Sequence, residues 1–217
     1  MEREVLSELV KDRILTWILQ GDLAPGSRIV ETRVARELGT SQAPVREALR
    51  NLATLGFVEM QPYRGSRVRK PTKQELIEAI EVRAELEALA GRLAATYRTA
   101  KCLSDLEKLM AGMQEAAERG DAHDHAVKNT RFHARIVEAA GNRTLERLWS
   151  MLEPFSRTYV TASAPGMDLH WLGNRHHDIL AAIRDGDSDR AAETMRTHAG
   201  EAARLIEGME HPELEAG

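Results

Sequence analysis

The sequence predicts a mainly α-helical protein in two parts, residues 1–70 and residues 71–217. Aromatic residues make up only 4% of the chain, whereas Ala, Leu, Glu and Arg, which favour helices over strands, are abundant. Apolar residues recur at three- and four-residue spacing over most of the sequence, as they do along one face of a helix. Only residues 57–70 show the pattern of short strands, so a small β element is expected there.

Composition and charge limit the class of protein. With 42% hydrophobic and 29% charged residues, the chain has enough apolar material for a packed core. Its single cysteine, Cys102, fits a reducing compartment, and neither a signal peptide nor a membrane-spanning run is found, so we expect a cytoplasmic protein without a membrane partner. Residues 1–70 hold 12 Lys and Arg against 9 Asp and Glu, whereas the rest holds 18 against 25, so DNA would bind the first part.

The first part begins with two predicted helices. Apolar residues recur between Val5 and Ile18, and Gly21 can end this first helix as a C-cap. A turn at residues 22–26 then leads to a second, short helix at residues 32–38. The apolar stripe of the first helix comprises Val5, Leu6, Leu9, Val10, Ile14, Trp17 and Ile18.

Almost no sequence separates the second helix from a predicted third one. Gly39 can end the second helix, and Ser41 can cap the third, with Pro44 tolerated in its first turn. A tight pair of helices is the arrangement of a helix-turn-helix, whose second helix projects into the major groove of DNA. On the third helix, Val45, Ala48, Leu49 and Leu52 share one side, while Ala43, Arg46, Glu47 and Arg50 share the other.

A β hairpin is predicted after the third helix. Gly56 can end that helix, and residues 57–60 and 66–70 form two strands around a turn at residues 62–65. The arginines of the third helix and of the hairpin have an alternative interpretation, in which they form a solvated helix face and a charged hairpin without a DNA partner. As a wing beside the helix-turn-helix, the hairpin would be basic, with Arg64, Arg67, Arg69 and Lys70.

Several motifs of residues 5–70 occur together. They resemble the winged-helix domain of the GntR family of bacterial transcription regulators, and the resemblance covers nearly all of this part. The motifs that carry it are Leu23-Ala24-Pro25-Gly26, Glu31, the stretch SQAPVREAL at residues 41–49, Leu52, Gly56 and Arg64-Gly65.

This resemblance implies roles for individual residues. Arg46 would approach base edges, whereas Arg33 and Ser41 would contact phosphates. The wing tip at Arg64-Gly65 would reach the adjacent groove. Gln42 stands where the family often has Arg, so a contact to adenine or a water-mediated contact is expected there. The candidate DNA-binding residues are therefore Arg33, Ser41, Gln42, Ala43, Arg46, Arg50, Arg64 and Gly65.

Residues 71–217 are predicted to form an all-helical bundle of 147 residues, which is long enough for a core of its own. Three predicted helices carry polar residues on faces that should be apolar. Asn129 and His133 share an arc of a helix at residues 126–140, His176 lies on the stripe of a helix at residues 172–184, and His198 lies on that of the last helix. We expect the other histidines, His123, His125, His170, His177 and His211, at the surface.

The inward polar residues can form a metal site. Three neutral imidazoles and the amide oxygen of Asn129 suit a divalent first-row metal, zinc first, with nickel or manganese as alternatives. Because this set contains no anionic ligand, the ion would keep its charge and attract a carboxylate. The alternative is that each histidine is a hydrogen-bonded core residue.

The second part also resembles a known domain, the FCD effector domain of the FadR-like branch of the GntR family, over residues 72–208. The resemblance implies a metal held by Asn129, His133, His176 and His198, although many members have Asp at the first of these positions. The motifs that carry it are VRAELE at residues 82–87, Asn129 with Phe132-His133, Ala140-Gly141-Asn142, His176 with Ile179, Gly186-Asp187, and Met195 with His198.

Arg83 and Glu87 lie one turn apart on the inward stripe of Leu76, Ile80 and Ala90, where charges are costly unless they are paired. A buried ion pair between them is one interpretation. The resemblance implies the other, in which Arg83 binds the carboxylate of a small effector, for which a guanidinium fork is well shaped.

The sequence as a whole favours a homodimeric repressor that binds palindromic operator DNA and is gated by a small organic acid at or near the metal. A metalloenzyme is one alternative, but no Glu or Asp stands at a general-base spacing beside the histidines, and a winged helix would be unexplained. An architectural DNA binder with a structural metal is another, and it predicts no effector response. We therefore expect no enzyme activity.

Overall fold

The computed structural model describes residues 2–20, 22–61, 64–70, 72–162 and 168–207. The chain divides into two compact units, Met1–Pro71 and Thr72–Gly217, and each is described by itself. Of the residues singled out above, Gly21, His211 and the turn residues 62–63 lie outside the described part, as do the side chains of residues 1–5. Among the described residues, no helix combines the length and the apolar character needed to cross a membrane.

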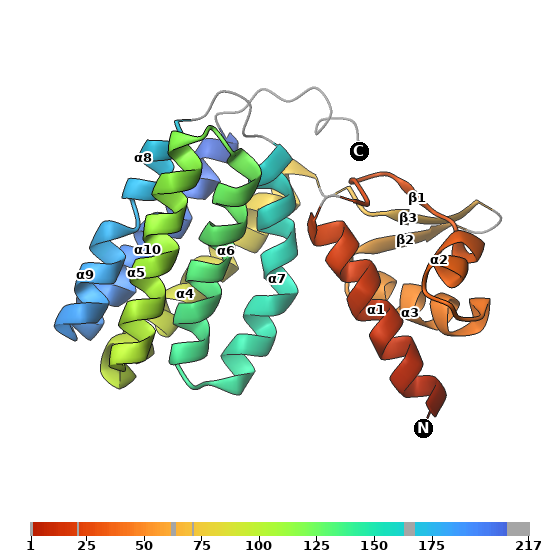
Figure 1. The fold of residues 1–217 in the computed structure, drawn as a ribbon, viewed down its shortest axis with the longest axis horizontal. Helices are drawn as coiled ribbons and strands as arrows, with labels where there is room; N and C mark the ends of the chain where they lie inside the picture. The colour runs from red at the N-terminus through yellow and green to blue at the C-terminus, as the bar shows by residue number, and fades with distance from the viewer. Residues whose placement is uncertain (1, 21, 62–63, 71, 163–167, 208–217) are drawn as a thin grey trace. The chain divides into compact units, whose positions relative to one another are not determined.

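The first unit consists of three helices and a small antiparallel sheet (Figure 1). The predicted third helix and hairpin are present, but a further strand, β1, was missed because two residues show no periodicity. β1 pairs with β3, where Arg28 lies opposite Arg67, and gives the sheet the order β1-β3-β2. The elements are α1 (Glu2–Gln20), β1 (Arg28–Ile29), α2 (Glu31–Glu37), α3 (Gln42–Thr54), β2 (Val58–Gln61) and β3 (Gly65–Val68).

The core of the first unit lies between α1 and α3. Ile14 on α1 and Leu49 on α3 are fully buried. The predicted stripe of α1 is wrong at its start, because Leu6 and Leu9 are 40% and 62% exposed. The buried face at this turn runs through Ser7 and Val10 instead, so Leu6 and Leu9 lie to either side of it. The other buried members of these two helices are Val10, Trp17, Ile18, Val45, Ala48 and Leu52.

The junction between α2 and α3 is as tight as the sequence predicts. Gly39 adopts a φ of 62°, a left-handed conformation that lets the chain turn directly after α2. Ser41 is the N-cap residue of α3, as predicted, but its side chain makes no capping hydrogen bond. Its exposed hydroxyl is therefore available for another partner.

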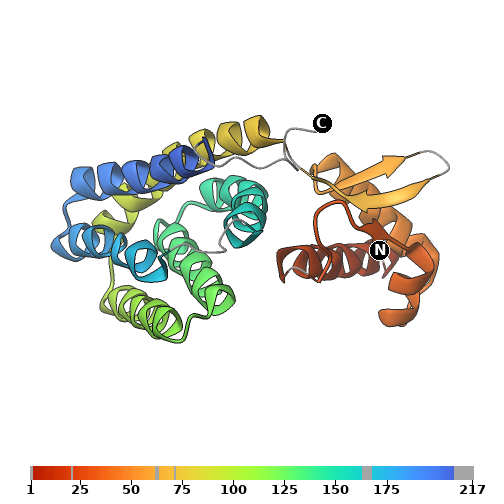
Figure 2. The ribbon, with the colours of Figure 1, turned by 90° about the horizontal axis from the view of Figure 1, so that it is seen from above.

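The second unit is a bundle of helices, which Figures 1 and 2 show from two directions. α4 and α10 run side by side (Figure 2). The capping box of Thr72 and Glu75 begins α4, because each side chain accepts a hydrogen bond from the other residue's backbone N–H. The described helices are α4 (Lys73–Tyr97), α5 (Ala100–Glu118), α6 (Ala122–Ala139), α7 (Arg143–Ala162), α8 (Leu169–Asn174), α9 (His177–Asp185) and α10 (Ser188–Glu207).

The continuous helix predicted at residues 172–184 is wrong. α8 ends at Asn174 and α9 begins at His177, so His176 lies in the break between them. The break is a turn in which the backbone N–H of His176 donates to the carbonyl of Gly173 at 3.2 Å. Helical spacing extends across this break without a visible signal, because the apolar residues on either side keep the same period.

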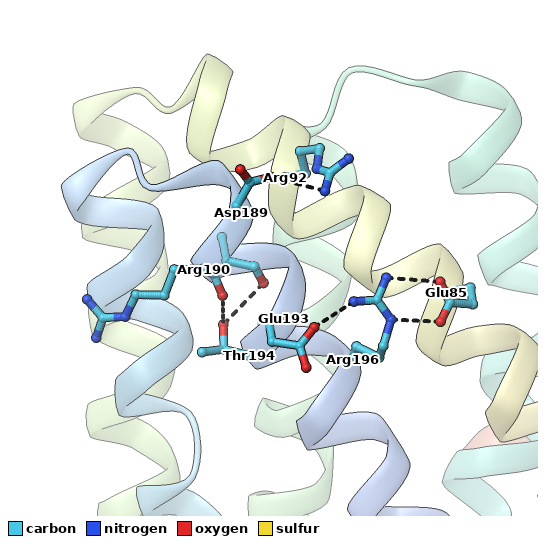
Figure 3. A network of polar contacts seen from close by, with 8 residues as sticks. Glu85, Arg92, Asp189, Arg190, Glu193, Thr194 and Arg196 are labelled. Carbon is cyan, nitrogen blue, oxygen red and sulfur yellow. Dashed lines mark hydrogen bonds and ion pairs between the residues drawn. The ribbon is translucent and has the colours of Figure 1, made fainter.

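Close packing joins α4 to α10. A Cβ atom at Gly91 would lie 2.8 Å from both the carbonyl oxygen of Ala191 and Cγ of Met195, so only glycine allows this approach. Exposed ion pairs flank the contact (Figure 3). Arg196 donates to both oxygens of Glu85, at 2.7 and 3.1 Å, and Arg92 lies 3.1 Å from Asp189. Such exposed pairs contribute little stability, so the apolar packing dominates.

Candidate metal centre and DNA-binding face

The exposed side of α3 carries the residues predicted to face DNA. Gln42, Ala43, Arg46 and Arg50 are exposed, while the opposite side of the helix is buried in the core, so the predicted division into two faces is confirmed. α3 therefore presents a polar surface with two arginines one turn apart.

Arg46 makes an ion pair that the sequence analysis missed. Its Nη2 and Nε atoms lie 2.8 and 3.1 Å from Oε2 of Glu31 at the start of α2. The Arg46 side chain is 50% exposed, so the pair is solvated and contributes little stability. Glu31 can therefore orient the guanidinium without holding it away from another acceptor.

The remaining candidate DNA-binding residues are all exposed. Arg33 lies on α2, Ser41 at the start of α3, and Arg64 and Gly65 at the start of β3. Gly65 adopts a φ of 84°, which a residue with a Cβ rarely tolerates. This conformation shapes the tip of the wing and explains why glycine occupies the position.

Three histidines from separate elements meet in the second unit. His133 comes from α6, His176 from the break before α9, and His198 from α10. One ring nitrogen of each lies within 4.8 Å of the others, and Nε2 of His133 is 3.3 Å from Nε2 of His176. The convergence predicted from helical faces is therefore present, although His176 reaches the cluster from a turn rather than from a helix.

The geometry of this His cluster, defined as His133, His176 and His198, fits a metal ion. Two nitrogens that bind one tetrahedral zinc at about 2.0–2.1 Å lie about 3.3–3.4 Å apart, which matches the separation of the two Nε2 atoms. Nδ1 of His198 is buried and has no hydrogen-bond partner among the described residues. Because an unpaired buried nitrogen is costly, this atom also indicates a missing partner.

Burial keeps His176 and His198 in the form that binds metals. Desolvation, followed by repulsion from His133, lowers the pKa of His176 to about 3. Desolvation and the neighbouring His176 likewise place the pKa of His198 well below its ordinary value. Both imidazoles are therefore neutral near pH 7, and a neutral imidazole has a lone pair for a metal.

Asn129, the fourth predicted ligand, and the histidines outside the cluster differ in burial. Asn129 is half-buried one turn before His133, and no described contact of its side chain tests its predicted role as a ligand. His123, His170 and His177 are exposed as predicted.

The prediction that His125 lies at the surface is wrong. Its side chain is 4% exposed, because α8 packs over the first turns of α6, a contact that periodicity within α6 cannot reveal. Burial lowers the pKa of His125 despite a hydrogen bond with the backbone of Leu169.

Glu87 of α4 was predicted to point inward, but its contact with the histidines was not. Its Oε1 accepts hydrogen bonds from Nε of Arg83 at 2.6 Å and from Nε1 of Trp149 at 2.8 Å. Its Oε2 lies 3.1 Å from Nδ1 of His133. No sequence spacing placed an acidic residue beside the histidines, but the fold brings α4 against α6 and with it Glu87 against His133.

The environment of Glu87 favours its charged form. Burial alone would raise the pKa of this fully buried carboxyl, but Arg83, His133 and the Trp149 N–H together lower it. The ion pair considered for Arg83 and Glu87 is thus present. The guanidinium of Arg83 also lies 5.4 Å from the centre of the Trp149 ring, and its Nη atoms have no hydrogen-bond partner among the described residues.

Family models match both parts of the chain. The model described as bacterial regulatory proteins, gntR family, matches residues 6–68. The model of the FCD domain matches residues 78–201.

Curated proteins and solved structures are similar over most of the chain. A probable D-xylose utilization operon transcriptional repressor of Paenarthrobacter nicotinovorans is 36% identical over 91% of this chain and 87% of its own length. The gluconate operon transcriptional repressor of Bacillus licheniformis is 22% identical over 88% of this chain and 81% of its own. The structure of McbR/YncC of E. coli has a TM-score of 0.80 and 26% identity, covering 93% of this chain and 97% of that one.

Proposed function

Because the chain belongs to the GntR family of bacterial regulatory proteins and carries an FCD domain, we propose that it is a repressor gated by a small organic acid. As a member of this family it is a DNA-binding, ligand-responsive transcription regulator rather than an enzyme. Two similar proteins are named as operon repressors, which supports the sign of regulation that we propose. The proposal includes a cytoplasmic location, where bacterial operator DNA lies.

The proposed DNA contacts come from the exposed side of α3 and the wing. Arg46 would read base edges in the major groove, with Gln42, Ala43 and Arg50 beside it. Arg33 and Ser41 would bind phosphates, and Arg64 with Gly65 would reach the neighbouring groove. One recognition helix reads only a few base pairs, so we propose that a twofold homodimer binds a palindrome.

The observation that carries the effector part of the proposal is the meeting of three histidines at one point, two of them buried and His198 half-buried. Together with Asn129 they would hold a divalent metal, with zinc favoured by the nitrogen-rich set and nickel or manganese as alternatives. When bound, the metal supplies a positive charge that attracts a carboxylate. Arg83 would bind the same acid through its Nη atoms, since Nε is already engaged by Glu87.

The first test is the metal content of full-length protein purified without chelator or affinity-tag metal. We expect close to one divalent metal per chain, and a screen of small carboxylic acids should contain one that raises the melting temperature. The double variant His133→Ala/His198→Ala should lose the metal while remaining folded. Absence of metal from the wild-type protein together with no response to any acid would contradict the proposal.

A further inference from the structure

The two oxygens of the Glu87 carboxylate have different partners. Oε1 accepts from Arg83 and Trp149, whereas Oε2 faces Nδ1 of His133 at 3.1 Å. Both atoms are buried without a well-aligned hydrogen bond to any described residue, so the 3.1 Å ion-pair contact between them is the polar contact that each makes. At these two atoms, the Glu87 carboxylate and the His133 imidazole are therefore each other's partner.

Holding a carboxylate at this place is costly, which argues against an incidental contact. Glu87 is fully buried, and a buried charge is tolerated only when it is paired and hydrogen-bonded. Arg83 supplies the opposite charge and Trp149 a neutral donor, so one oxygen is satisfied by these two residues alone. The second oxygen is free to fix an imidazole.

We propose that Glu87 is a positioning residue for metal binding, which holds His133 with its proton on Nδ1 and its Nε2 directed at the ion. The inference rests on the metal site of the proposed function. An ionised carboxylate can only accept hydrogen bonds. The Nδ1 atom beside it therefore carries the proton, and the Nε2 atom keeps the lone pair. That Nε2 is the atom that lies 3.3 Å from Nε2 of His176.

The second ligand shows the same arrangement with a different acceptor. Nδ1 of His176 lies 3.1 Å from the carbonyl oxygen of Gly173, which fixes its proton on Nδ1 and again leaves Nε2 for the metal. Unlike a carbonyl group, the Glu87 carboxylate carries a negative charge, and the His133 side chain alone would separate it from the ion. It would offset part of the charge of a metal held by neutral ligands.

The test compares zinc affinity of the full-length protein with that of Glu87→Gln, by competition with a chromophoric chelator. We expect Glu87→Gln to lower zinc affinity by about 10- to 100-fold, the usual effect of losing such a partner. Glu85→Gln is the matched control, since Glu85 lies on the same helix but is exposed and paired with Arg196. It should bind zinc as the wild-type protein does.

Cobalt absorption separates positioning from a purely structural role. At saturating Co²⁺, Glu87→Gln should show altered visible bands, because the orientation of one imidazole has changed, and a structural role alone would leave the bands unchanged. Should Glu87→Gln not fold, Trp149→Phe removes one of the donors that hold Glu87 and should lower zinc affinity by a smaller factor.

Zinc affinity within twofold of wild type, with unchanged cobalt bands, would overturn the role of Glu87 but not the metal site. Wild-type protein that binds no zinc would overturn both.

Discussion

Arg46 is both the residue proposed to read a base and one half of an exposed ion pair. Its guanidinium lies 2.8 Å from Glu31 through Nη2, while half of its side chain remains accessible to solvent. An exposed pair of this kind is easily exchanged for a better acceptor, such as the O6 and N7 atoms of guanine. Glu31 therefore orients Arg46 before DNA arrives.

Replacing Arg46 with Ala should weaken operator binding by about 1–3 kcal/mol and relax the preference at one base-pair position. The reason is the loss of a bidentate contact to a base edge. The measurement is a set of dissociation constants for the selected operator and for single-base variants of it. Arg36→Ala is a suitable control, since Arg36 is an exposed arginine of the adjoining helix α2. Undiminished operator affinity in Arg46→Ala would contradict the base-reading role.

The pH dependence of stability tests the burial of His176 without metal. The folded-state pKa of His176, at about 3, lies below the ordinary value of 6.5, so the unfolded chain binds protons first as pH falls. Metal-free protein should therefore lose stability as pH decreases from about 6.5 toward 3, by up to about 1.4 kcal/mol per pH unit for one such group.

Urea unfolding of chelator-treated protein at pH 7 and pH 5 measures this effect. His176→Asn should flatten the dependence, because Asn does not titrate. Stability that is equal at both pH values in the wild-type protein would contradict the neutral, buried state of His176.

At the scale of the elements, the contact between α4 and α10 brings together the helices that carry Glu87 and His198. Gly91 allows the close approach, since an added Cβ would lie 2.8 Å from the Ala191 carbonyl oxygen. Gly91→Ala should therefore destabilise the protein by about 1–3 kcal/mol. Gly200→Ala is the control, because a Cβ at Gly200 on α10 would meet no atom within 4 Å and should stabilise by about 0.4–1 kcal/mol.

Thermal or urea unfolding of both variants measures the difference. Equal stability of Gly91→Ala and the wild-type protein would show that the two helices separate without cost, contrary to the packing described here.

Much of the element structure could be predicted from the sequence. The period of apolar residues marks α3 and α6 clearly, and it places His133 on the buried face of its helix. The same argument could not find the break that holds His176, because apolar spacing continues across it. It also missed β1, since two residues carry no period.

Contacts between elements were the main limit on predicting the site. Periodicity identified Glu87 as an inward residue of α4, but it did not identify His133 as its neighbour, because the partner of a helical face is set by how the helices pack. The burial of His125 was missed for the same reason, as it depends on α8. Three of the four predicted metal-binding residues nevertheless meet, since each lies where the apolar pattern predicts a buried face.

For the whole molecule, gating is a difference in binding free energies. An acid changes operator affinity only if it binds the DNA-competent form and the incompetent form with unequal affinity. A shift of the population from 1:99 to 99:1 requires about a 10⁴-fold difference, or about 5.5 kcal/mol. A carboxylate that contacts both a metal and Arg83 makes enough charged contacts for a difference of this kind, provided that the two forms arrange the contacts differently.

In the function proposed above, an acid bound at the metal site controls DNA binding. The most direct test is the affinity of the zinc-loaded full-length chain for an operator duplex selected from a random-sequence pool, with and without the acid that raises its melting temperature. We predict at least a tenfold change for the wild-type protein and no change for His133→Ala/His198→Ala. An unchanged wild-type affinity, or the same change in the double variant, would contradict the claim.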